Sequence, residues 1–491
     1  MQSNARTLLL IFVLTLLFTT STLVATAFAA PMDWQGTFGA ETALIQHHKR
    51  TSDAYINDDG SEQIQPSPGD RSDASFQNYI LKLSPTIVIN DGATLYGELS
   101  TNYNSSGYLG ESSTQKQVGA GASFGDALYL QHTSNGRPNL VLNQFYLKIF
   151  ADTATYIIGR QSFDWGAGAI YSGGNKTWDR YKTIQDGLTV KFKVGNFHVT
   201  PYWAKISMGN TLSSSDDTKT YGLTVLYDSV ERDMAFGLLY GKKTTGAYST
   251  FFTSGQGHNL GRTDVKITDL YMKKGVGDYT LTIEAPLISG DLGNVYSPDQ
   301  STKYKAYAVV TESSYKFNDN WSAGALVGIA SGEDGLGPQF KAMYLNPNYQ
   351  IANLLFRYNL AAVADTTQNL YDSYITNARY LKLHGNYQTG PWSLNAAVIT
   401  AKANEVAKGN GNWAFNHTRN KRFISNSKQN NNLGTELDFN AIYQWNNTVS
   451  VHADVGYLFV GDYFNYTNSA DGSTVKLRNS YSTVIGVSAT F

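Results

Sequence analysis

The amino-acid sequence predicts an all-β fold, a transmembrane antiparallel β-barrel of about 18 strands. The clearest evidence lies in residues 433–491. In residues 449–460, apolar Val449 and Val451 alternate with polar Ser450 and His452. Alternation with a period of two gives a strand one apolar and one polar face. The last segment alternates in the same way and stops on the aromatic Phe491, which is typical of the closing strand of a membrane barrel.

Composition agrees with this fold. Only 16% of the 491 residues are charged and 13% are aromatic, and beyond the first thirty residues there is no run of about 20 apolar residues for a helical span. The mean hydropathy of −0.30 is compatible with a barrel, because its lumen-facing half is polar. The net charge of −1 predicts no nucleic-acid partner. Without cysteine, disulfides and thiolate metal sites are excluded. We expect no cofactor and no metal.

The first 29 residues have the features of a signal peptide. Arg6 is followed by an apolar core over residues 8–18 and by Ala27-Phe28-Ala29, a small-x-small cleavage site. The predicted mature chain, residues 30–491, is one barrel in the outer membrane of a Gram-negative bacterium. Its expected partners are outer-membrane lipids, lipopolysaccharide and small hydrophilic solutes, and homo-oligomerisation is left open.

Taken in order, the segments repeat a pattern of strand, short turn, strand and long polar loop. Residues 34–46 open the barrel, residues 51–73 form a loop, and residues 76–89 return to Asn90-Asp91-Gly92, a strong hairpin signal. Other short turns are predicted at residues 151–153, 195–196, 228–233, 275–277, 318–320, 389–391 and 446–448. Short turns face the periplasm in such barrels and long loops face outward.

Strand-like segments begin near residues 34, 76, 93, 140, 154, 186, 197, 219, 234, 263, 278, 303, 321, 377, 392, 433, 449 and 478, which makes about 18. An apolar segment at residues 349–360 leaves two interpretations. It folds within a long outer loop, residues 331–376, or it pairs with residues 340–345 to make 20 strands. We favour 18, because residues 340–345 are shorter than the roughly 9–11 residues of one span.

The apolar face of each strand must meet lipid, so the polar face lines the lumen. Alternation around Leu188, Val190 and Phe192 directs Lys191 and Lys193 inward. The same rule directs charges of both signs into the lumen: Lys148, Glu284, Glu436, Asp438 and Asp454. These charges either neutralise one another or create a field across a water-filled pore that sets selectivity.

Residues 162–185 form an unusual loop that is rich in glycine and contains Trp165, Trp178 and Arg180. We expect this loop to fold inward and narrow the pore. An ordinary outer loop is the alternative. Lys182 belongs to the same pore-lining set.

Gly159-Arg160-Gln161, Asp186-Gly187 and residues 433–438 resemble the alginate-export-like family of outer-membrane porins. The resemblance implies an 18-stranded barrel with an arginine-lined pore that passes sugars or anionic polysaccharide. It implies that Arg160, Arg180 and Asp186 lie at a constriction. The chain departs from the family in lacking a dense arginine lining.

A rival hypothesis rests on residues 132–137. His132 and Ser134 share a strand face, so the imidazole could take the hydroxyl proton. The hexapeptide resembles a motif of outer-membrane phospholipase A, although that family's second motif is absent. A structural or adhesive barrel is a third hypothesis. We predict a passive porin for small hydrophilic solutes or ions, sugars among them, and no enzyme.

Overall fold

The computed structural model describes residues 32–47, 54–56, 62–64, 74–101, 107–108, 115–117, 130–132, 140–207, 217–246, 261–297, 299–358, 371, 373–417, 421–425, 427–467 and 474–491. The predicted signal peptide, residues 1–29, lies outside them. No helix in this part of the chain is long and apolar enough to cross a membrane.

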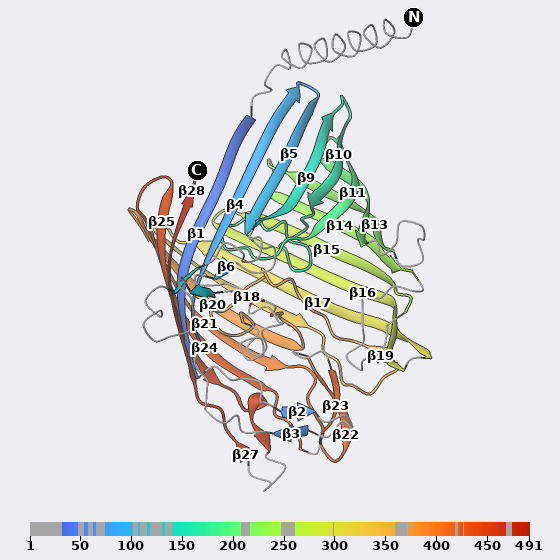
Figure 1. Cartoon of the computed structure of the whole chain (residues 1–491), viewed down its shortest axis with the longest axis vertical. Coiled ribbons are helices and arrows are strands. Elements are labelled where there is room, and N and C mark those ends of the chain that lie inside the picture. The colour runs from blue at the N-terminus through green and yellow to red at the C-terminus, as the bar shows by residue number, and fades with distance from the viewer. Residues whose placement is uncertain are drawn as a thin grey trace, which may run out of the picture.

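Eighteen long strands of the described chain form one closed antiparallel barrel (Figure 1). Each pairs with the next along the chain, and β28 pairs with β1 from Thr37↔Thr490 to Gln46↔Tyr481, which closes the ring. The strands are β1 (Met32–Gln46), β4 (Ala74–Asn90), β5 (Ala93–Thr101), β9 (Leu140–Phe150), β10 (Ala154–Ser162), β11 (Ile184–Val194), β12 (Phe197–Ser207), β13 (Thr218–Ser229), β14 (Met234–Thr245), β15 (Asp264–Val276), β16 (Tyr279–Ser297), β17 (Gln300–Lys316), β18 (Trp321–Ala330), β20 (Ala378–Thr389), β21 (Trp392–Ala403), β24 (Asn432–Gln444), β25 (Val449–Val460) and β28 (Ser480–Thr490).

Short elements lie in or beside the loops. They are β2 (Ala54–Ile56), β3 (Glu62–Ile64), β6 (Gly107–Tyr108), β7 (Gln115–Gln117), β8 (Leu130–His132), β19 (Gln339–Phe340), β22 (Asn412–Asn416), β23 (Lys421–Ser425), β26 (Tyr466–Thr467), β27 (Thr474–Val475) and the 3-10 turn η2 (Asp462–Phe464).

The prediction of 18 strands is confirmed, and the alternative of 20 is wrong. Of the segments that would have added two strands, β19 is two residues long and lies parallel to β17 without crossing the barrel. Residues 349–358 contain turns and coil but no strand. The predicted short turns connect the strands at one end. Gly195, Gly277 and Gly390 adopt positive φ there, as tight hairpin turns require.

The outer surface of the barrel is apolar. Outward side chains such as Leu270, Leu383 and Ile485 are 52%, 53% and 56% exposed, which only a lipid environment makes favourable. Aromatic pairs follow the short-turn end. Trp321 lies 4.4 Å from Tyr387 between ring centroids, and Trp392 lies 4.8 Å from Tyr443. A closed barrel with an apolar band and an aromatic girdle is an outer-membrane barrel of Gram-negative bacteria.

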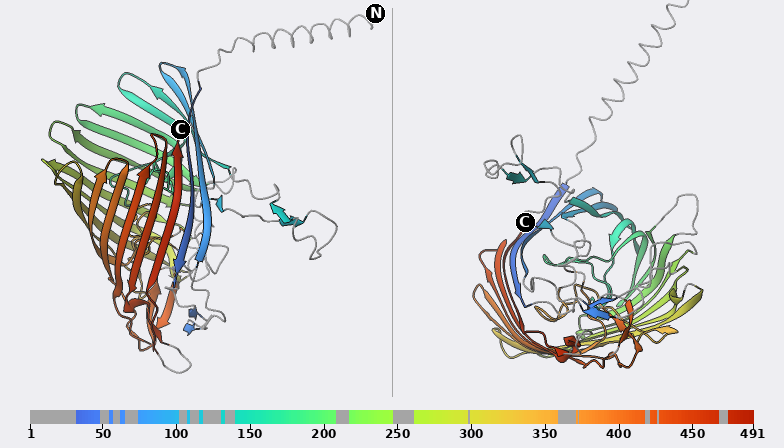
Figure 2. Two further views of the ribbon diagram at one scale, coloured as in Figure 1. Left: turned by 90° about the vertical axis from the view of Figure 1, so that its left-hand side faces the viewer. Right: turned by 60° about the horizontal axis from the view of Figure 1, so that its bottom comes forward.

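Two connections enter the barrel instead of standing outside it. Loop A comprises residues 163–183, between β10 and β11. Loop B comprises the described residues between β18 and β20, which are 331–358, 371 and 373–377. Figure 2 shows the strands as a ring around these connections. In loop B, Leu354 and Leu355 are buried against inward-facing residues of the wall such as Ala397 and Ile399. The expectation of an outer loop over residues 331–376 is therefore corrected for residues 340–358, because their apolar side chains are buried inside the barrel.

Candidate functional site

Loop A is fixed to the barrel wall by a buried ion pair. The Arg180 guanidinium contacts the Glu41 carboxylate of β1, and the side chains are only 6% and 4% exposed. The guanidinium carbon also lies 3.8 Å from the ring centroid of Tyr371 in loop B. Asn78 of β4 donates to Glu41 Oε1 over 3.0 Å and to the Tyr371 hydroxyl over 2.5 Å. This cluster joins two strands and both loops.

Lysines hold the same loop at two further points. Lys182 forms a buried ion pair with Glu98 of β5. Lys82 of β4 donates from Nζ to the carbonyl oxygens of Lys176 and Asp179 over 2.6 and 3.2 Å. A lysine has three donors, so it can bind several carbonyl groups at a loop end that lacks secondary structure.

A carboxylate of β16 holds the first half of loop A. The Glu284 carboxylate accepts hydrogen bonds from the backbone N–H groups of Ala167 and Ala169 over 2.5 and 3.3 Å. Gly166 precedes them with φ of 64°, and a Cβ there would lie 2.5 Å from Glu284 Oε2. Glycine is needed for both its conformation and this close approach.

Carboxylates of β24 hold loop B in the same way, by accepting hydrogen bonds from its backbone N–H groups. Glu436 of β24 accepts from the N–H groups of Leu354 and Leu355 over 2.6 and 2.7 Å. Asp438 accepts from the N–H of Asn353 over 3.0 Å. The acidic residues predicted to line the pore at these positions face inward, but the loops cover them.

The two loops also contact each other. The Asn346 N–H donates to the carbonyl of Ala169 over 2.7 Å. Asn348 Oδ1 accepts from the N–H groups of Arg180 and Tyr181, each over 3.2 Å, and its amide donates to the Tyr181 carbonyl over 2.6 Å. Asparagine suits this position because one side chain both donates and accepts. The loops thus form one hydrogen-bonded layer across the lumen.

Inward-facing residues nearer the short turns are more accessible. Lys191 and Lys193 of β11 are exposed, whereas Thr189, on the same face but closer to the loops, is buried. Lys148 of β9 is half-buried, and its ammonium lies 4.6 Å from the ring centroid of Tyr96. In the late strands, Asp454 is half-buried and accepts from Asn440 Nδ2 over 2.8 Å.

Arg160 and Asp186 do not belong to this interior. They pair across β10 and β11 with 2.8 Å between Nη2 and Oδ2, and both side chains are nearly half exposed. They lie on the face of Ile158 and Leu188, which meets lipid. The expectation that this pair lines a constriction is corrected, because strand alternation directs both side chains outward.

The outer part of loop B contains a second polar cluster. Glu333 accepts from the Tyr296 hydroxyl over 2.5 Å, and its own N–H donates to His417 Nε2 over 2.8 Å. Burial raises the pKa of the Glu333 carboxyl above its ordinary value. Burial lowers the pKa of His417 from 6.5 to about 3, so its imidazole is neutral and can accept the hydrogen bond.

The described residues do not test the rival hydrolase hypothesis. His132 ends β8, and Ser134 lies outside the described residues. The described part of the chain holds no group of three or more His, Asp or Glu residues that could bind a metal ion.

No protein-family model matches the sequence, and no curated protein matches it. Solved structures do resemble the fold. OccK11 (OpdR) of Pseudomonas aeruginosa is 9% identical to this chain, covers 94% of this chain and 96% of its own, and has a TM-score of 0.48. OccK2 (OpdF) of Pseudomonas aeruginosa in complex with glucuronate is 10% identical, covers 94% of this chain and 98% of its own, and has a TM-score of 0.47. Outer-membrane expressed OmpT of Vibrio cholerae is 11% identical, covers 95% of this chain and 99% of its own, and has a TM-score of 0.36. At these values the similarity assigns neither a family nor a solute.

Proposed function

We propose that the chain is a passive outer-membrane channel for small hydrophilic solutes or ions, in which loops A and B form the narrowest part. The observation that carries this proposal is the pair of infolded loops, each tied to inward carboxylates of the wall. Eighteen strands enclose a lumen too wide to be filled by the wall's own side chains. The loops reduce that lumen on the outer side, while Lys191 and Lys193 remain exposed below them.

Charges around the remaining path would select solutes by sign. Many of the lumen charges are already neutralised within the loop layer, as in the buried pair of Lys182 with Glu98. Lys191 and Lys193 are exposed, and neither forms an ion pair with the described residues. Exposed positive charge below the constriction favours anions.

The alginate-export-like resemblance supports only part of this proposal. Of its three candidates, Arg180 faces the interior, where Glu41 neutralises it, and Arg160 and Asp186 face outward. An arginine-lined path for an anionic polysaccharide is therefore not what these residues favour. Small solutes, with simple sugars among them, suit the arrangement better.

Planar-bilayer recording with the pure protein tests this proposal. We expect stepwise conductance increments and a reversal potential of the sign that indicates anion preference in a salt gradient. A protein that inserts and gives no conductance steps would contradict the channel. The hydrolase hypothesis is tested separately: phospholipase activity in the wild type that Ser134→Ala abolishes would establish a second function.

A further inference from the structure

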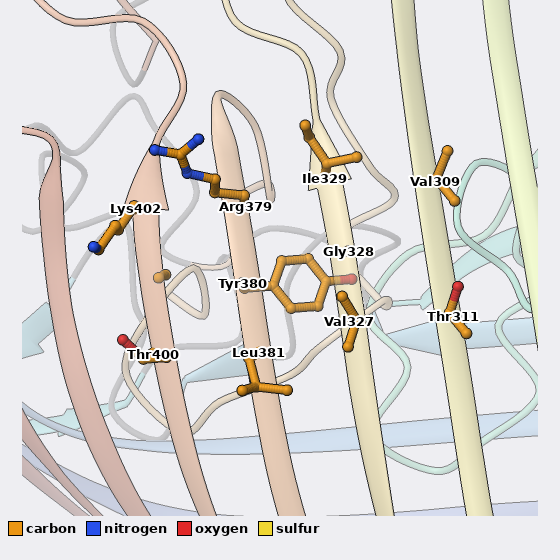
Figure 3. A pocket seen from close by; sticks show the side chains of 11 residues that line it. Val309, Thr311, Val327, Gly328, Ile329, Arg379, Tyr380, Leu381, Thr400 and Lys402 are labelled. Atoms are coloured by element: carbon orange, nitrogen blue, oxygen red, sulfur yellow. The ribbon is translucent and has the colours of Figure 1, made fainter.

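The outer face of the barrel carries a groove of about 400 Å³ across β17, β18, β20 and β21 (Figure 3). Its lining includes the apolar side chains of Val309, Val327 and Leu381. These residues have the outward parity of the lipid face and are 38%, 51% and 37% exposed. The groove therefore opens toward lipid and is separate from the lumen.

Two basic residues stand at one end of this groove. Arg379 and Lys402 are direct partners in the register of β20 and β21. Arg379 is the second residue of β20 after loop B, and Lys402 precedes the last residue of β21. Both therefore lie at the long-loop end, which faces outward and is level with the head groups of the outer leaflet. Figure 3 shows both side chains above Leu381 and Thr400.

The charge of this pair is not neutralised by the wall. Some other outward basic residues at this end pair with aspartates. Lys205 and Lys219 lie 3.0 and 3.4 Å from Asp217 Oδ2. Within the described residues, neither Arg379 nor Lys402 has a carboxylate within ion-pair distance. Directly opposed residues on neighbouring strands are about 5 Å apart, so one phosphate can contact both cations.

The outward face stays apolar from the groove toward the short turns. Gly385 and Ala396 are register partners on the same outward face. A Cβ on Gly385 would meet no atom within 4 Å, and Ala396 is exposed. The register partners Leu383 and Val398 lie between this pair and the groove, and both are exposed on the outward face. An extended acyl chain that leaves the groove would lie over these apolar side chains.

We propose that this groove binds a phosphorylated glycolipid of the lipid A type, with a phosphate on Arg379 and Lys402 and an acyl chain over Val327 and Leu381. Arginine binds phosphate through paired N–H donors and lysine adds a point charge. The apolar groove excludes water around one chain. This inference does not depend on whether the barrel conducts.

The test is lipid retention by the full-length barrel in detergent, measured by native mass spectrometry during titration with diphosphorylated lipid A. The double variant R379Q/K402Q should retain it at least about tenfold more weakly, since one hydrogen bond to a charged group is worth about that factor. The matched control K205Q/K219Q, at the same membrane level, should retain it like the wild type. Heat-modifiable migration on gels verifies that each variant is folded.

Two further measurements distinguish the contribution of the groove from that of the two cations, and a glycolipid from other lipids. Val327→Trp should fill the groove and weaken retention while both cations remain. Dephosphorylated lipid A and phosphatidylglycerol should bind more weakly than lipid A. The proposal would be overturned if K205Q/K219Q weakened the retention of lipid A as much as R379Q/K402Q does. It would also be overturned if the wild type retained dephosphorylated lipid A as well as lipid A. Equal retention of phosphatidylglycerol would overturn the assignment to a glycolipid.

Discussion

Arg180 of loop A and Glu41 of β1 form an ion pair inside the barrel, although 139 residues separate them in the sequence. The pair is excluded from solvent. It contacts Asn78 of β4 and Tyr371 of loop B, and these two residues are hydrogen-bonded to each other. A buried pair is expensive to form, and removal of one partner leaves the other charge uncompensated. The position of loop A therefore depends on this contact.

Arg180→Met should lower the free energy of unfolding by about 3–5 kcal/mol, the usual cost of leaving one partner of a buried ion pair alone. Because loop A is released, single-channel conductance should also rise. Urea unfolding in lipid vesicles and bilayer recording measure these effects. The double variant Glu41→Leu/Arg180→Met should recover part of the lost stability. If the free energy of unfolding of the double variant fell by the full sum of the two single-variant losses, the two residues would not be coupled.

Glu436→Ala should loosen loop B. The N–H groups of Leu354 and Leu355 would lose their acceptor, at a cost of about 1–3 kcal/mol each. We expect larger and noisier single-channel currents. Leu437→Ala is the matched control, because the next residue of β24 faces lipid and touches neither loop. Identical currents from both variants would contradict the role of Glu436.

Lys191→Gln/Lys193→Gln should shift the reversal potential in a salt gradient toward cation preference. A unit charge 4 Å away is worth about 1 kcal/mol in water, so each lysine changes the local concentration of an anion by no more than about fivefold. Lys205→Gln, on the outer face, serves as the control. The same shift in both variants would exclude a lumen effect of the two lysines.

His417 should make the outer part of loop B sensitive to acid. Its folded-state pKa of about 3 lies below the ordinary 6.5. The stability that it contributes is therefore complete above pH 6.5 and is lost as the pH falls toward 3. Glu333 acts in the opposite direction, since its raised pKa contributes stability that is lost as the pH rises.

The comparison of wild type with His417→Gln separates these two groups, because glutamine supplies an acceptor that does not titrate in this range. Hydrogen exchange of the peptide over residues 331–341 should show a larger loss of protection between pH 7 and pH 4.5 in the wild type. An equal loss in both proteins would assign the pH dependence to a group other than His417, and Glu333 is not that group because its contribution grows as the pH falls.

Much of the barrel could be predicted from sequence because its signals are local. Alternation fixed the strand faces, and turn residues such as Asn90-Asp91-Gly92 located the hairpins. The paths of the loops depend on contacts that are distant in sequence, such as Glu436 with Leu354. The apolar run at residues 354–356 was a signal for burial, but sequence alone could not distinguish a folded-in loop from an extra strand. The direction of Arg160 depended on a strand phase that only the register with Asp186 resolved.

The most direct test of the central claim is whether the barrel conducts while loop B is held inside it. The chain has no cysteine, and a Cβ on Gly456 of β25 would lie 2.9 Å from Asn353 Cβ, slightly less than the about 3.5–4.5 Å of a disulfide. Asn353→Cys/Gly456→Cys should therefore tie loop B to the wall. Asp164→Cys/Gly173→Cys, whose Cβ atoms would lie 3.5 Å apart within loop A, is the control crosslink. The structure predicts stepwise conductance of the same size in the oxidised and reduced Asn353/Gly456 channel. A silent oxidised channel that opens on reduction, with the control unaffected, would contradict it.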